Sequence, residues 1–88
     1  SFQTPGELLF FERNRENKRL ARRGVSFPAT RDEMATFLGV SLRRYADWER
    51  MNRVPTDQEI GQIAKKLGWT DAQRRMFRDA CDQMKREA

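Results

Sequence analysis

The chain has 88 residues, with 18 Lys and Arg against 13 Asp and Glu and a formal charge of +5. This length suits one domain with a single modest core, and the positive charge favours an anionic partner, nucleic acid before others. The longest unbroken apolar run is Leu8–Phe11. Because a spanning helix needs roughly 20 apolar residues, we expect no membrane segment, and no stretch reads as a signal peptide.

Histidine is absent from the chain, and Cys81 is its one cysteine. Without His, the usual metal-ligand sets and the commonest general base cannot be assembled, so we expect no metal, no cofactor and no enzymatic activity. A single Cys cannot form an internal disulfide, which favours a cytoplasmic protein. The chain begins at Ser1 rather than Met, so a further domain outside this sequence stays open.

Four helix starts share one signature, a Thr followed three residues later by Glu or Gln: Thr4 and Glu7, Thr30 and Glu33, Thr56 and Glu59, Thr70 and Gln73. In this capping box the two side chains satisfy backbone donors that the helix leaves open. Ser41, directly after Gly39 and Val40, marks a fifth start. With no competing strand pattern, we predict an all-α fold of five helices, at residues 5–22, 31–38, 42–50, 57–67 and 71–86.

Apolar residues at helical spacing predict the core. From the second and third helices we expect Met34, Ala35, Leu38, Val40, Tyr45 and Trp48 to face inward. From the fourth and fifth we expect Ile60, Ile63, Ala64 and Leu67, and Met76, Phe77, Ala80, Cys81 and Met84. On this stripe Cys81 is expected to be a buried, inert thiol rather than a redox sensor.

Residues 30–51 hold two short capped helices joined by Leu38-Gly39-Val40-Ser41, which is typical of a helix-turn-helix. The hypothesis is a single DNA-binding domain over residues 1–88, with the second of these helices in the major groove.

The residues Gly39-Val40-Ser41, then Tyr45, then Trp48-Glu49, and Pro55 beyond resemble the lambda-repressor-like helix-turn-helix family, also called XRE or Cro/C1. The resemblance covers residues 30–68, and the loop after the first helix and the run at 67–77 are similar to the MmyB-like subgroup. Two positions depart from the pattern: Met51 stands where a glycine commonly ends the recognition helix, and Arg31 replaces a frequent Gln. The resemblance implies a five-helix lambda-repressor-like bundle that reads bases with residues 42, 43 and 47.

On the helix at 42–50, the face away from Tyr45 and Trp48 carries Leu42, Arg43, Ala46 and Asp47. Arg43 is the first candidate for base reading, because its planar fork can hold O6 and N7 of a guanine. Leu42 could pack on a thymine methyl or cover the core. Asp47 could accept from cytosine N4 or orient a neighbouring Arg, and the sequence leaves these alternatives open.

Candidate phosphate contacts surround this helix: Arg22, Arg23, Thr30, Arg31, Ser41, Arg44, Arg50 and Arg53. Each Arg could equally be a surface charge, since Glu12, Glu16 and Glu49 offer competing partners. For Trp48 and Glu49 we expect a structural role, the Trp in the core and the Glu in a cap or a local ion pair.

These expectations combine into a transcriptional regulator, a repressor, that associates with the nucleoid and binds double-stranded DNA as a homodimer on a palindromic operator, with half-sites about 34 Å apart. Candidate dimer contacts, if exposed, are Phe2, Phe10, Phe11, Met76 and Met84. Two alternatives stay open: a protein-interaction module or antitoxin-like partner, and a plasmid or phage DNA binder driven largely by charge.

Overall fold

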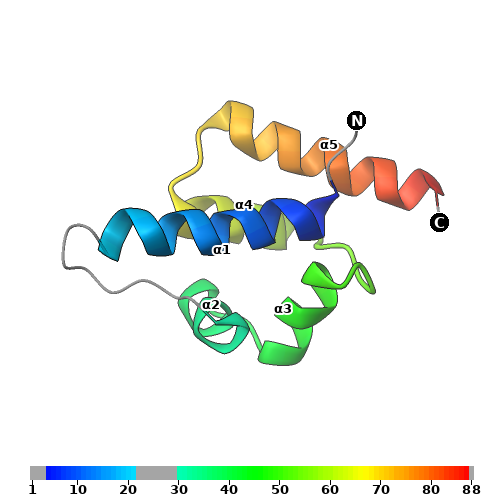
Figure 1. Ribbon diagram of the computed structural model, residues 1–88. Coiled ribbons are helices and arrows are strands. Elements are labelled where there is room, and N and C mark those ends of the chain that lie inside the picture. Colours follow the sequence, from blue (N-terminus) through cyan, green and yellow to red (C-terminus); the bar gives the residue numbers. More distant parts are fainter. Residues whose placement is uncertain (1–3, 22–29, 88) are drawn as a thin grey trace.

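The computed structural model describes the backbone of residues 4–21 and 30–87 and the side chains of residues 4–14 and 30–86. Within these residues the chain forms five helices and no strand (Figure 1): α1 Pro5–Ala21, α2 Arg31–Leu38, α3 Leu42–Glu49, α4 Asp57–Leu67 and α5 Asp71–Glu87. The all-helical prediction is therefore confirmed, and the described helix boundaries agree with the predicted ones to within one residue.

The predicted capping signatures explain why the helices begin where they do. In α4, Glu59 N–H donates to Thr56 Oγ1 at 3.2 Å while Thr56 N–H donates to Glu59 Oε1 at 2.8 Å. The same reciprocal pair opens α1 at Thr4 and α5 at Thr70. At α2 the arrangement differs, because the Glu33 carboxylate accepts from the Thr30 hydroxyl at 3.1 Å. Such caps each contribute about 1 kcal/mol, which matters most for the short helices.

The turn between α2 and α3 depends on a left-handed residue. Gly39 has φ +77° and ends α2, with its N–H directed at the carbonyls of Ala35 and Thr36. Two residues later, Ser41 caps α3 by accepting from Arg44 N–H at 3.1 Å. From α4, the Gln62 amide donates to Leu38 O at 2.6 Å, which satisfies a carbonyl at the end of α2. Two consecutive helices thus meet across a tight turn that these hydrogen bonds stabilise.

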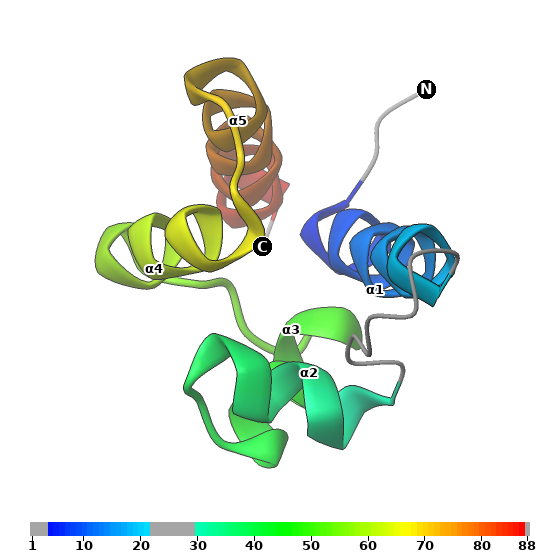
Figure 2. The same cartoon turned by 90° about the vertical axis from the view of Figure 1, so that its left-hand side faces the viewer.

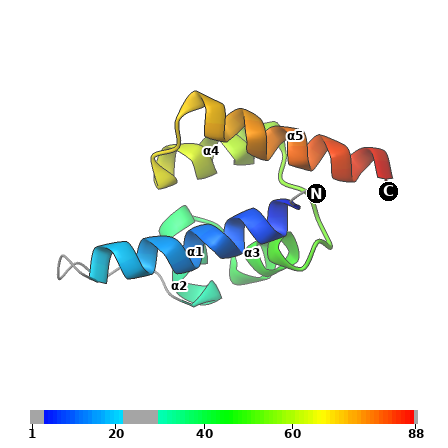
Figure 3. The same ribbon diagram turned by 45° about the horizontal axis from the view of Figure 1, so that its top comes forward.

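Helices α1, α4, α5 and the α2–α3 pair surround one apolar centre (Figure 2), and α1 and α5 run in opposite directions (Figures 1 and 3). The largest fully buried side chains in that centre are Leu9, Met34, Leu38, Tyr45, Trp48, Ile60, Ile63 and Phe77. Most inward-facing predictions are confirmed, with Val40 and Leu67 packed against the cluster from its edge. Cys81 is fully buried, and burial raises the pKa of its thiol to about 12.

Ala46 lies on the face of α3 away from Tyr45 and Trp48, as expected, although it is only 8% exposed. One prediction of burial was wrong. Met76 was expected in the core but is 52% exposed, since it lies at the margin of the contact between α1 and α5.

The backbone at residue 51 shows how α3 ends without the glycine that is common at this position. Met51 adopts φ +68°, the conformation that glycine usually supplies, and its N–H donates to Trp48 O at 3.3 Å. Asn52 N–H donates to Asp47 O at 2.9 Å, so the two bonds form a Schellman motif with methionine at the left-handed position. The Met51 sulfur lies 3.4 Å from Gly6 N at the start of α1. A positive φ is costly for methionine, but the same side chain also contacts the start of α1.

None of the helices traced in residues 4–21 and 30–87 combines the length and the apolar character that crossing a bilayer requires. Over the same residues, the acidic, Cys and His side chains nowhere gather in threes as a metal site would need.

Candidate nucleic-acid interface

Five of the predicted site residues line one open groove of about 770 Å³ between the start of α2 and the outer face of α3. They are Thr30, Arg31, Leu42, Arg43 and Arg50. Its other lining residues are Arg13, Asp32 and Ala46. We call this surface the α2–α3 groove. Two of the residues chosen from the sequence for base reading and three of those chosen for phosphate contact thus share a single surface.

The outer face of α3 combines apolar and cationic groups. Leu42 is 47% exposed, although leucine is usually buried, and Arg43 next to it is exposed as well. On the opposite face, Tyr45 and Trp48 are buried and hold the helix against the core. The exposed face of α3 is therefore fixed in place and free to contact a ligand.

The amino ends of α2 and α3 differ in charge. α3 has no acidic residue in its first turn and carries Arg43 and Arg44 there, so its helix dipole and its side chains attract an anion together. The first turn of α2 carries Asp32 and Glu33, and the Glu33 carboxylate lies at the cap. These two carboxylates oppose phosphate binding at the start of α2.

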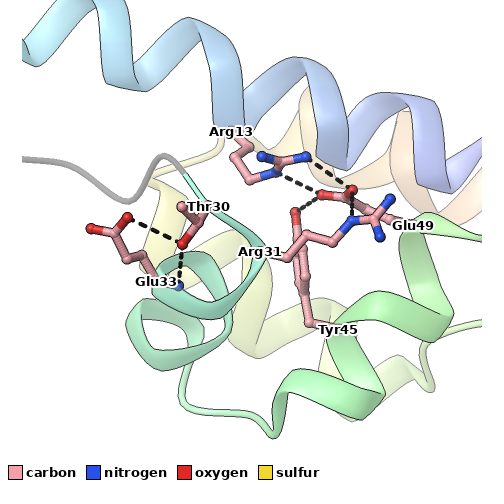
Figure 4. Close-up of polar contacts among 6 residues, drawn as sticks. All are labelled: Arg13, Thr30, Arg31, Glu33, Tyr45 and Glu49. Atoms are coloured by element: carbon pink, nitrogen blue, oxygen red, sulfur yellow. Dashed lines mark hydrogen bonds and ion pairs between the residues drawn. The ribbon is translucent and has the colours of Figure 1, made fainter.

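Beside the groove, the carboxylate of Glu49 at the end of α3 accepts hydrogen bonds from three residues (Figure 4). Arg13 from α1 binds its carboxylate with two nitrogens, at 2.9 and 3.2 Å. Arg31 Nε from α2 donates at 2.9 Å, and the Tyr45 hydroxyl also donates to it. The Glu49 side chain is only 2% exposed. This cluster joins the first three helices at one buried charge.

The titration of the cluster follows from these contacts. Burial by itself would raise the pKa of Glu49, but the hydrogen bonds from Arg13, Tyr45 and Arg31 outweigh burial and lower it. Desolvation and the neighbouring carboxylate raise the pKa of Tyr45. The hydrogen bond to Glu49 raises the pKa of Arg13 further above its already high value. Glu49 is therefore ionised at neutral pH, and it orients both guanidinium groups.

Glu49 corrects one expectation, because its ion pairs are not local: Arg13 lies 36 residues away and Arg31 lies 18 residues away. Only the Tyr45 contact, four residues back, could be read from helical spacing. Arg31 itself is 38% exposed and lines the groove, so it combines an internal ion pair with an accessible position.

Arg44, predicted to contact phosphate, pairs with Glu59 of α4 at 2.8 Å. The Arg44 side chain is 46% exposed, so the pair lies at the surface and is exchangeable. Glu59 also forms the cap of α4, which fixes the carboxylate in position.

Of Thr30, Ser41, Asp47 and Arg53, only Thr30 lines the groove. The hydroxyls of Thr30 and Ser41 already serve as helix caps. Asp47 is half-buried and Arg53 is exposed, and neither is among the residues that line the groove. The predicted contacts at residues 22 and 23 lie outside the described residues.

Sequence reasoning missed two charged residues of the groove, Arg13 and Asp32. Arg13 belongs to α1, and no local pattern places it beside α3. Asp32 directly follows Arg31, a predicted phosphate contact, and this adjacency was the signal in the sequence that could have placed it in the groove. A separate exposed apolar pair, Phe10 at 51% and Phe11 at 53%, lies on α1, with the Arg13 guanidinium 5.1 Å above the Phe10 ring.

Comparisons of this chain with protein-family models, with curated proteins and with solved structures found no match.

Proposed function

We propose that α2 and α3 form the helix-turn-helix of a sequence-specific double-stranded DNA-binding protein, in which α3 enters the major groove. The observation that carries this proposal is the shared α2–α3 groove, where Leu42 and Arg43 lie beside Arg31 and Arg50. A guanidinium can read guanine bidentately, and neighbouring cations can neutralise phosphates on either side of the bases.

The wider electrostatics support the same partner. The chain carries a net charge of +5, and the first turn of α3 holds no acidic residue of its own and carries Arg43 beside Arg44, which is paired with Glu59. A major groove about 12 Å wide admits one α-helix, and the buried face of α3 leaves its other side available. The resemblance of residues 30–68 to the lambda-repressor-like family agrees with this arrangement.

Within this proposal the protein is a cytoplasmic, nucleoid-associated transcriptional repressor that acts as a homodimer on a palindromic operator. One helix-turn-helix reads only a few base pairs, so specificity against a genome generally requires two copies. Phe10, Phe11 and Met76, each more than half exposed, are the described apolar residues available for contact between copies.

The direct test is selection from a random double-stranded DNA library with the wild type and with Arg43→Ala, at one near-physiological salt concentration. We expect the wild type to enrich a palindromic motif and Arg43→Ala to lose preference at one position of each half-site. Arg75→Ala is the matched control, because it removes the same charge from an exposed site on α5. If the wild type selects no motif, or if both variants behave alike, α3 does not read bases.

A second candidate function is a protein-interaction module, and the adjacent exposed rings of Phe10 and Phe11 favour it. Isolated exposed apolar residues are ordinary, but two neighbouring aromatics, each about half exposed, offer an apolar contact surface. The library selection separates the two functions, because an interaction module would enrich no sequence.

A further inference from the structure

We infer that Asp32 is a specificity residue of the α2–α3 groove, which accepts a hydrogen bond from an exocyclic amino group of a base, cytosine N4 or adenine N6. This inference rests on the proposed function and adds to it a residue on α2 and a class of base edge.

The first observation is location. Asp32 is exposed and lines the same groove as Leu42 and Arg43, the residues expected to meet base edges. It is the one acidic residue among the described residues that line this groove. Asp47, the acidic residue that the sequence suggested for this contact, is not part of the lining.

The second observation is that the Asp32 carboxylate forms none of the caps or ion pairs found among the described residues. Thr30 and Glu33 already cap α2 between them. Over the part of the chain that the structure describes, the carboxylate takes part in no hydrogen bond or ion pair, although Arg31 and Arg43 line the same groove. What remains for it structurally is a favourable interaction with the dipole of α2, of the kind that Asp71 provides in the first turn of α5.

The third step is chemical. An ionised carboxylate only accepts hydrogen bonds, and phosphate oxygens repel it. In the major groove the hydrogen-bond donors of the bases are the amino groups at cytosine N4 and adenine N6. If the groove receives DNA, those amino groups are the base atoms that the Asp32 carboxylate can bind.

The test repeats the library selection with Asp32→Asn and Asp32→Ala beside the wild type. Asp71→Asn is the matched control, since it removes the same charge from the first turn of a helix outside the groove. We expect Asp32→Ala to lose preference for cytosine or adenine at one motif position by about tenfold, while Asp71→Asn keeps the wild-type motif. In Asp32→Asn the amide oxygen still accepts and the amide nitrogen donates, so the preference at that position should shift toward adenine, which offers both N6–H and N7. The base lost at that position identifies which amino group is bound.

The outcomes of this selection separate a failure of the Asp32 inference from a failure of the proposed DNA-binding function. If the wild type selects a motif that both Asp32 variants leave unchanged while binding every sequence more tightly, the carboxylate merely repels phosphate and the inference is overturned alone. If the wild type selects no motif, the inference and the proposed function fail together. Melting curves of each variant, expected within a few degrees of the wild type, ensure that the comparison is made on folded protein.

Discussion

Gly6→Ala tests the packing that places α3, because Gly6 in the first turn of α1 touches the end of α3. A Cβ atom at this position would lie 2.4 Å from Glu49 O and 3.0 Å from Met51 Sδ. The first contact is with backbone, so it cannot be relieved by rotating a side chain. Helix propensity alone predicts the opposite sign, since alanine is favoured over glycine in helices by roughly 1 kcal/mol.

The size of the effect follows from the geometry. The contact with Glu49 O must lengthen from 2.4 Å to at least 3.0 Å, so α1 has to move away from α3. Overpacking of this kind costs about 1–3 kcal/mol, and the same movement weakens the pair between Arg13 and Glu49. We therefore expect a net loss of about 2 kcal/mol in the free energy of unfolding, equivalent to a fall of roughly 10 °C in melting temperature.

The assay is urea and thermal unfolding followed by circular dichroism at neutral pH. Gly61→Ala is the matched control, because Gly61 also lies in a helix but a Cβ there meets nothing within 4 Å. In that variant propensity should prevail and stabilise the protein by up to about 1 kcal/mol. If Gly6→Ala is stabilised to the same extent as Gly61→Ala, the close approach of α1 to α3 is refuted.

Two further substitutions test the charged groups near the α2–α3 groove. Glu49→Gln leaves Arg13 and Arg31 without their carboxylate and should cost about 3 kcal/mol of unfolding free energy at pH 7. Because folding lowers the pKa of Glu49, its contribution to the free energy of unfolding is present above the ordinary pKa of 4.5 and is lost as the pH falls through the folded-state pKa. The urea midpoints of wild type and variant should therefore converge on acidification. A constant difference between them down to pH 3 would contradict this role. Glu59→Gln keeps an acceptor for the cap of α4 but releases Arg44, so DNA affinity by fluorescence anisotropy should rise and the slope of log K against log salt should steepen by about 0.9. An unchanged slope would mean that Arg44 contacts no phosphate.

The five helices and their limits could be predicted from the sequence to within one residue. A cap such as Thr56 with Glu59, and a stop such as Gly39, act over three to five residues, so the pattern that predicts them is the interaction that forms them. The same holds for part of the groove, because the short turn after α2 leaves few arrangements for Arg31, Leu42 and Arg43 relative to one another.

The contacts that join distant segments could not be predicted from the sequence, because they depend on how the helices pack. The partners of Glu49 come from 18 and 36 residues away, and the approach of Gly6 to α3 depends on how α1 crosses it. Tertiary packing likewise brings Arg13 of α1 to the groove, where no local pattern places it. Helical periodicity indicates which side of a helix is apolar. Which charged residues of different helices come into contact depends on how the helices pack, and these contacts define the candidate site.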